Sequence, residues 1–480
     1  MTINLPDDTI SEILGHVVSN GSIIMSHCQI WGQPVPRLIM MSWVCRQWRR
    51  TVERTPSLWA FVNMIIYSEP DEEAYKGCGI EMEYRSRVFP VTGFKTTVAR
   101  FLDRSGQHLL NVDLTVVGRD DTMCDFPALS SDLFDDVSLS SDVFDAVSLL
   151  TEQAYRWGKF RYEGPSGLLS LILSGHELPK LTEIDCRFED LDGFDYDCFR
   201  HCFRQSPLKR FGLAKHITLG SLEKILGDYS PRLESLVVSS LMGDTIVDVH
   251  TWRNITSLKL KDWDTASVEL LFSSLEFPSL KEAVFQQGYG NWPTEAFRDF
   301  VARSGCVLDT LILKDISLSH QDLLKILETL PGLQTLHIHL SSWYGLTGEP
   351  QCPITPELFM NLTVTEKDLT QSLIPHLKSL VIVSDVQINF DDRQVVTMVE
   401  SRWVSPSLDQ SKIIKKGQGC GIRSVVLRLT SQDVDLQLYQ QLEKLAKQGL
   451  RVEVVGKPAR EFGQSDSELT EDDEGADLQT

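Results

Sequence analysis

The chain has 480 residues, of which 42% are hydrophobic, and its 46 basic and 67 acidic side chains give a formal net charge of −21. This composition supports a sizeable core and excludes general disorder, and the length suits several ordinary domains or one repeat solenoid with an appendage. So negative a chain is not expected to have nucleic acid or an anionic membrane as its main partner. The acidic side chains are concentrated in two segments. Residues 120–152 hold nine carboxylates and residues 464–480 hold seven, with no Lys or Arg in either segment.

The ten cysteines are scattered without a pairing pattern, and the N-terminal residues are polar and acidic, unlike a signal peptide. No apolar run approaches the ~18 residues that a membrane-spanning helix needs. We therefore expect a soluble protein with free thiols in a reducing compartment, the cytoplasm, the nucleus or both.

Two helical segments are predicted near the N-terminus. Asp7 or Asp8 can cap the first segment, whose apolar residues follow one face of a helix: Ile10, Ile13, Leu14, Val17 and Val18. The second helical region stops before Thr55-Pro56, and its apolar face is expected to carry Leu38, Met41, Cys45, Trp48 and Val52.

From residue 109 onward, one template recurs: apolar, two of any kind, apolar, one of any kind, apolar. It begins at residues 109, 157, 181, 208, 233, 255, 280, 308, 333, 377 and 422. From 157 to 333 the steps are 22–28 residues, a regularity that chance matches would not hold. The two later steps of 44 and 45 residues each indicate a degenerate repeat or an insertion, and LFMNLTV at 358 is a candidate for a damaged unit.

Each template is expected to form a short strand, and the stretches between the templates are often helical, as after Ser319 and over 294–301 and 434–447. A strand and a helix at a step near 25 residues are typical of a leucine-rich repeat solenoid, whose strands stack into a curved parallel sheet. The stretch FLDRSGQHLLNVDL at 101 is echoed by FVARSGCVLDTLIL at 300, where the Gly can end a helix before a strand. The predicted fold class is therefore α/β, a small helical unit followed by an irregular repeat solenoid.

Residues 130–139 and 140–149 read SSDLFDDVSL and SSDVFDAVSL, a tandem copy with two differences. We interpret it as a duplication in a surface loop between the strands at 109 and 157. The alternative is a docking peptide with Phe134 and Phe144 as paired anchors. Residues 461–480 have no periodicity and are predicted to form a disordered acidic tail.

Three blocks near the N-terminus resemble an F-box: LPDDTISEIL at 5–14, VCRQW at 44–48 and TPSLW at 55–59. The F-box pattern runs Leu-Pro-acidic, an Ile/Leu helix, Val-Cys-Arg-x-Trp and Leu-Trp, and the blocks occur here in that order. Residues 19–36 make the first loop longer than in compact F-boxes. This loop, the Arg-Ser-Gly unit and the irregular repeats are similar to the large F-box families of mushroom-forming fungi.

The resemblance implies a substrate-recognition subunit of a cullin-based, SCF-type ubiquitin ligase. Its F-box would bind a Skp-type adaptor, which joins cullin and RING subunits, while the repeat domain captures the target protein. Such a subunit is not an enzyme, because its contribution is proximity. By motif match, the adaptor-binding residues are Leu5, Pro6, Ile10, Ile13, Leu14, Val44, Cys45 and Trp48. For Ile13, Val44 and Trp48 the alternative is a place in the helical core.

The predicted domains are the F-box at 1–62 with its extended loop 19–36, the repeat solenoid at 63–460 and the tail at 461–480. The acidic duplicated insert occupies about 119–152 of the solenoid. The alternative function is a leucine-rich repeat binding module or scaffold without ubiquitin ligase activity, in which the N-terminal helices only cap the solenoid.

We predict no catalytic residue, metal or cofactor. The glycines of Gly417-Gln-Gly419-Cys-Gly421 precede a strand, whereas a phosphate-binding loop follows one. Four residues could ligate zinc, but they lack a second close cysteine pair and suit a repeat helix better: Cys186, Cys198, His201 and Cys202.

A substrate surface is predicted from strand alternation, because the unassigned template positions face the open side of the sheet. After residue 255 they place five cationic or titratable side chains on that side: Lys259, Lys261, Lys314, His337 and His339. We hypothesise that they capture an acidic or phosphorylated protein segment, with Trp263 and Trp343 at strand ends as apolar anchors. The alternative is ordinary solvated strand residues. The identity of the substrate stays open.

Overall fold

The structure, a computed structural model, describes residues 6–19, 23–25, 27–28, 36–67, 89–90, 93–117, 140–188, 195–226, 232–242, 249–341, 352–364, 373–403 and 421–458. Leu5, Trp343, the first copy of the duplication, the glycines at 417 and 419 and the acidic tail lie outside these ranges. The chain divides into two units, Met1–Val307 and Leu308–Thr480. Across the described ranges, no helix is long and apolar enough to cross a membrane.

The N-terminal helices are α1 (Asp7–Ser19), α2 (Arg37–Met41) and α3 (Arg46–Arg54), followed by the 3₁₀ helix η1 (Pro56–Ala60). The first helix and the end of the second region before Thr55 are as predicted. The second region consists of two helices, α2 and α3, with a turn between them. Cys45 caps α3, and its Sγ accepts a hydrogen bond from the Trp48 backbone nitrogen at 3.5 Å. α1 packs against both α2 and α3.

Parallel strands form the sheet of the first unit, in the order β1-β3-β5-β6-β7-β8-β9-β11-β13. Their bounds are Ile23–Met25, Phe61–Tyr67, Leu110–Val117, Trp157–Glu163, Glu183–Arg187, Arg210–Thr218, Ser235–Met242, Ser257–Asp264 and Glu282–Tyr289. Every template of this unit forms a strand, which confirms the prediction. Equivalent template residues are neighbours across the sheet: Leu236 pairs with Leu258, and Leu258 with Ala283.

The second unit repeats this arrangement in the parallel order β14-β15-β16-β17-β18. The strands are Thr310–Lys314, Thr335–Leu340, Ser379–Ser384, Ser424–Val434 and Arg451–Pro458. All four templates of this unit are strands, so the predicted α/β repeat architecture is confirmed.

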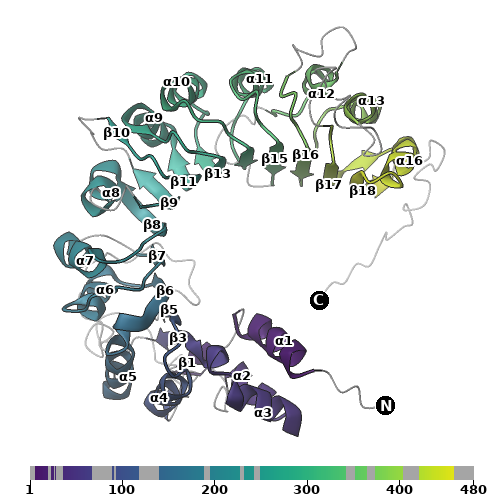
Figure 1. The fold of residues 1–480 in the computed structure, drawn as a ribbon. Helices are drawn as coiled ribbons and strands as arrows, with labels where there is room; N and C mark the ends of the chain where they lie inside the picture. Colours follow the sequence, from purple (N-terminus) through teal and green to yellow (C-terminus); the bar gives the residue numbers. More distant parts are fainter. Residues whose placement is uncertain are drawn as a thin grey trace, which may run out of the picture. The chain divides into compact units, whose positions relative to one another are not determined.

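Helices follow the strands and, within each unit, line one face of the sheet (Figure 1). In the first unit they are α4 (Phe94–Arg104), α5 (Ser141–Thr151), η6 (Ala154–Arg156), α6 (Ser166–Leu173), α7 (Tyr196–Phe203), α8 (Leu219–Leu226), α9 (Thr265–Ser274) and α10 (Thr294–Ser304). In the second they are α11 (His320–Glu328), α12 (Pro356–Leu362), α13 (Asp392–Arg402), α15 (Leu436–Tyr439), η8 (Gln440–Leu442) and α16 (Glu443–Ala446). The predicted helix after Ser319 is α11, and the Ser319 hydroxyl caps it by accepting a hydrogen bond from the Asp322 nitrogen at 3.1 Å.

Two segment predictions were wrong. LFMNLTV at 358 is not a damaged strand, since Leu358, Phe359 and Leu362 are the buried face of α12. The second copy of the duplication is not a surface loop but α5. Its buried residues recur at helical spacing, which is why it packs as a repeat helix: Val143, Ala146, Val147 and Leu150.

Three sheet strands, β1, β3 and β18, begin at no predicted template. β1 comes from the long loop of the predicted F-box and pairs with β3, Ile23 lying beside Asn63. Two further pairs of short strands stand apart from the main sheets: β2 (His27–Cys28) with β4 (Phe89–Pro90), antiparallel, and β10 (His250–Thr251) with β12 (Leu275–Glu276), parallel.

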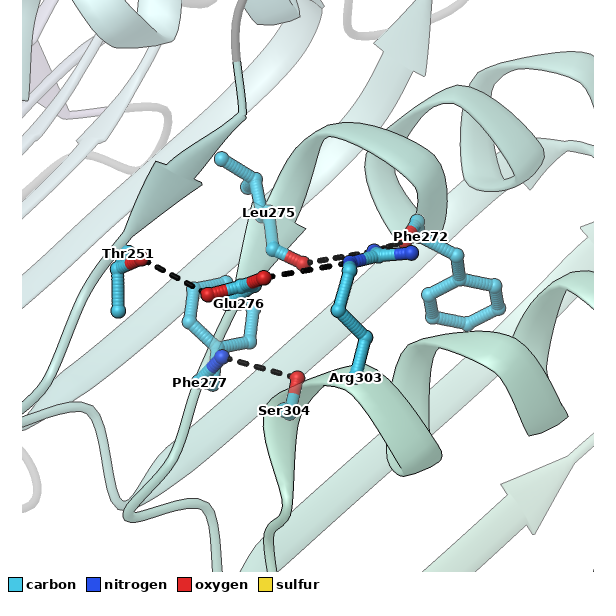
Figure 2. A network of polar contacts seen from close by, with 7 residues as sticks. All are labelled: Thr251, Phe272, Leu275, Glu276, Phe277, Arg303 and Ser304. Carbon is cyan, nitrogen blue, oxygen red and sulfur yellow. Dashed lines mark hydrogen bonds and ion pairs between the residues drawn. The ribbon is translucent and has the colours of Figure 1, made fainter.

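The second Arg-Ser-Gly motif ends α10 and binds neighbouring backbone (Figure 2). Gly305 has a φ of 61°, which a glycine adopts at no steric cost, and so it ends the helix. The Arg303 guanidinium donates to the Phe272 and Leu275 carbonyls, the latter at 3.2 Å, and its Nε lies 3.6 Å from Glu276 Oε1. Ser304 accepts a hydrogen bond from the Phe277 nitrogen at 3.1 Å. The motif therefore joins the end of α9 and β12 to the next repeat.

Candidate protein-binding surfaces

The N-terminal helices bury one apolar face. Ile10 and Leu14 are at most 1% exposed, and Leu38 of α2 and Val52 of α3 are fully buried. Gln47 of α3 donates a hydrogen bond to Asp7 Oδ1 at 2.9 Å, at the start of α1. The buried positions of Ile10 and Leu14 contradict their prediction as adaptor contacts, because i, i+4 spacing places both on the face of α1 that meets α2 and α3.

Other predicted adaptor residues are accessible. Val44 is 62% exposed and Ile13 is 40% exposed, Pro6 and Cys45 are exposed, and Trp48 is half-buried. The alternative of a core position is therefore wrong for Ile13 and Val44. Whether any of these side chains contacts an adaptor stays a prediction.

Met40 and Trp43 were missed by the sequence analysis although they are 44% and 60% exposed. They flank the turn between α2 and α3, where the Trp43 nitrogen donates to the Met40 carbonyl at 2.9 Å. A continuous helix over 38–52 would have hidden this turn. No sequence signal marks the turn, because Met40, Trp43 and Val44 keep the i, i+3, i+4 spacing of a continuous helix. We call the exposed apolar side chains at this turn, Met40, Trp43 and Val44, the N-terminal apolar surface.

Trp59 fixes these helices to the first repeat. Its side chain is 2% exposed, and its Nε1 donates to the Val52 carbonyl at the end of α3 at 2.7 Å. Its ring meets Phe101 of α4 edge to face at 5.0 Å, and the Arg104 guanidinium lies 4.7 Å from the ring centroid. Trp59 thus joins the end of α3 to α4, the first helix of the repeat domain.

The open face of the first unit carries alternate residues of its strands, as predicted from the period of 2. On β6 and β7 these residues are charged, and several of them pair with one another or with Asp113 of β5. Arg161 lies 3.9 Å from Asp113 and 3.7 Å from Glu163, and Arg187 lies 3.7 Å from Glu163. Burial raises the pKa of Asp113, and the nearby Arg161 opposes that rise.

Lys259 and Lys261 lie on the same face, on β11, and both are half-buried as the template predicts. Lys261 Nζ is 3.4 Å from Asp262 Oδ2. Lys259 makes no hydrogen bond or ion pair with any residue that the structure describes. Of the two lysines, Lys259 is therefore the more available to a partner.

Trp263 is fully buried, which contradicts its prediction as an exposed anchor. Asp262 has a φ of 52°, in the left-handed region, and this reverses the side-chain alternation of β11 by one residue. Trp263 therefore points into the core, against the backbone of Gly288.

In the second unit, Lys314, His337 and His339 lie on the open face beside Ile312, Val381 and Val383. The pKa of His337 is lowered to about 4, chiefly by burial and further by Lys314 and His339. His337 is therefore neutral at pH 7 and adds no positive charge to this face, and its role in binding stays a prediction. His339 Nδ1 lies 3.9 Å from Asp315 Oδ2. The predicted substrate residues thus belong to separate units, Lys259 and Lys261 to the first.

The four possible zinc ligands lie on β7 and α7. Burial raises the pKa of the Cys186 thiol, and it raises that of Cys202, which donates to the Leu173 carbonyl at 3.1 Å, to about 12. Among the described residues, no group of three or more His, Cys, Asp and Glu side chains is placed to hold a metal ion.

No protein-family model matches the chain, and no curated protein matches it. Among solved structures, the complex of Rad7 and Elc1 in yeast matches over 59% of this chain and 72% of that chain, with 14% sequence identity and a TM-score of 0.30. A likeness at this level carries no argument about function.

Proposed function

We propose that the chain is the substrate receptor of a cullin-based ubiquitin ligase. The N-terminal helices would bind a Skp-type adaptor, and through it cullin and RING subunits, while the repeat sheet captures the target protein. The F-box motifs at 5–14, 44–48 and 55–59 support this role, as does their place at the start of a repeat array. The receptor needs no chemistry of its own, because it raises the concentration of target near the ubiquitin-loaded enzyme.

The single observation that carries the proposal is the N-terminal apolar surface. Trp43 and Val44 are 60% and 62% exposed just after the five-residue helix α2, which carries the exposed Met40. Exposed apolar clusters mark protein interfaces, and a tryptophan at an interface is a frequent hot spot. Ile10 and Leu14 would contribute indirectly, because their buried side chains pack α1 against α2 and α3.

A second candidate is the repeat binding module without ligase activity. It is favoured by the pairing of β1 with β3, which makes the N-terminal segment one edge of the first unit's sheet. In that case the helices protect the edge of the sheet and bind no adaptor.

Co-expression with a tagged Skp-type adaptor separates the two candidates. Wild type should be retained on the adaptor, and Trp43→Glu with Val44→Glu should be lost, since charges would replace the exposed apolar contacts. The control is Leu171→Glu with Val307→Glu, which changes two residues that are 60% and 65% exposed elsewhere on the same unit. This control should be retained like wild type. Failure of wild type to bind the adaptor would favour the binding module.

A further inference from the structure

One row of residues crosses four strands on the open face of the first unit. The register places Asp185 of β7 beside Gly212 of β8, Gly212 beside Val237 of β9, and Val237 beside Lys259 of β11. Asp185, Val237 and Lys259 are all half-buried on this face. We call these four residues the β7–β11 row.

The acidic end of the row is Asp185. Its carboxylate lies over Gly212, since a Cβ built on that glycine would stand 2.8 Å from Asp185 Oδ1. Asp185 makes no hydrogen bond or ion pair within the described ranges. The neighbouring Arg161 and Arg187 are engaged by Asp113 and Glu163, so two cations face three carboxylates here.

The cationic end is Lys259, whose ammonium is likewise unengaged by the described residues. Its register neighbours are Val237 and Val284, so its long side chain stands between two apolar ones. Between the ends, Gly212 and Val237 present only backbone and an aliphatic side chain. A partly desolvated charge without a counterion is the kind of group that a partner of opposite charge stabilises.

Three strand spacings of about 4.8 Å separate the two ends, or roughly 14 Å. An extended peptide advances about 3.3 Å per residue and presents residues i and i+4 on one side, about 13 Å apart. The charges of the row therefore match an i, i+4 pair of opposite charges on an extended segment, and not an i, i+3 pair, whose side chains point to opposite sides.

From this geometry we infer that the β7–β11 row binds an extended peptide segment running across the strands. A Lys or Arg of the segment pairs with Asp185, a carboxylate or phosphate four residues away pairs with Lys259, and small or apolar residues between them cover Gly212 and Val237. The inference names the class of target segment that the repeat sheet of the proposed receptor would capture. Its biological role rests on that proposed function.

The test uses the purified full chain and fluorescein-labelled ten-residue peptides of Ala, Thr and Val. Each carries one Arg and one Glu, separated by one to six positions and placed in both orders, and a parallel series has phosphoserine in place of Glu. Fluorescence anisotropy should show the i, i+4 peptide of one order binding at least about threefold tighter than the i, i+3 peptide. Tighter binding of the phosphoserine series would identify phosphate as the anion, and equal or weaker binding would identify carboxylate.

Variants test the assignment of the two ends. Asp185→Asn and Lys259→Gln should each weaken the i, i+4 peptide about two- to fivefold, as expected for partly exposed ion pairs. The double variant Asp185→Lys with Lys259→Asp should bind again but prefer the opposite order of charges. Glu177→Gln and Lys281→Gln, exposed charges outside the row, are the controls and should leave affinity unchanged.

Three results would overturn the inference. The first is a peptide affinity that does not depend on the spacing of the two charges, and the second is a charge-swapped double variant that prefers the same order of charges as wild type. The third is a loss of peptide affinity in the control variants equal to that in Asp185→Asn and Lys259→Gln. The assay contains no adaptor, so its failure leaves adaptor binding untouched. Conversely, the chain can bind the peptide even if it does not bind the adaptor, so the two proposals fail independently.

Discussion

Residues with a left-handed backbone conformation recur at the ends of several strands. Ser240, Asp262, Gln287 and Asp315 have φ angles of 52–54°, and each stands two residues after its template. The next residue is buried in each case, as Leu241, Trp263 and Ile316 show. After Ser240, Asp262 and Asp315 the local cost of the left-handed backbone is thus offset by one more buried apolar side chain, whereas Gly288 after Gln287 leaves room for Trp263.

Asp262 allows this backbone to be tested. Asp262→Val should lower the free energy of unfolding by about 1–2 kcal/mol, because β-branched residues disfavour positive φ. Asp262→Gly removes the same carboxylate but accepts the backbone, so it should cost little or be stabilising. Urea unfolding followed by tryptophan fluorescence measures both. Equal losses for the two variants would show that the carboxylate matters and the backbone does not.

His337 predicts a pH dependence of stability. Its folded pKa of about 4 lies below the ordinary value of 6.5, so between these pH values the unfolded chain binds a proton that the folded chain does not. Stability should therefore fall as the pH drops through this window, by roughly 1 kcal/mol between pH 7 and pH 5 when solvent screening of this half-exposed group is allowed for. His337→Gln should reduce the loss by that amount in urea unfolding at the two pH values. An unchanged pH dependence in the variant would contradict the assignment.

At the residue scale, alternation predicted which template side chains lie on the open face, Lys259 and His339 among them. Alternation gave the wrong side for Trp263, the residue after Asp262. The sequence could not predict the positive φ of Asp262, because aspartate also occurs in strands with ordinary backbone angles. It also could not foresee the low pKa of His337, which depends on burial and on a neighbouring strand.

At the scale of elements, the tandem copy shows how composition can hide a helix. The residues Asp142 and Asp145 made the segment look like an acidic loop, yet they are exposed positions of α5. The buried Val143, Ala146 and Val147 already have helical spacing in the sequence. Phe144, proposed as a docking anchor in the alternative interpretation, is 54% exposed on the outer side of this helix.

Ala146 is fully buried, and the first copy has Asp136 at the matching position. Ala146→Asp should therefore destabilise the chain by about 3 kcal/mol, because a carboxylate would enter the core without a partner. Ser148→Asp, at an exposed position of the same helix, is the matched control and should change the free energy of unfolding by only about 0.5 kcal/mol or less. Thermal unfolding measures both. A small loss for Ala146→Asp would mean that the helix can shift and that its register is not fixed.

On the scale of the whole molecule, the boundary near residue 62 stays a prediction, and residues 1–307 belong to one of the two compact units. Tertiary contacts cross that boundary: Trp59 reaches Phe101, and β1 pairs with β3, contacts that no local pattern contains. The repeat array was predictable because its period is long and regular. The turn that exposes Trp43 was not, because the apolar residues on either side of it could also follow one continuous helix.

The affinity of the purified chain for a purified Skp-type adaptor, measured by calorimetry for wild type and Trp43→Ala, tests the proposed receptor role most directly. We predict a one-to-one complex with wild type and a dissociation constant about thirtyfold higher for Trp43→Ala, the effect of losing roughly 2 kcal/mol at a hot spot. Leu171→Ala should bind like wild type. No complex with wild type, or an unchanged dissociation constant for Trp43→Ala, would contradict this account.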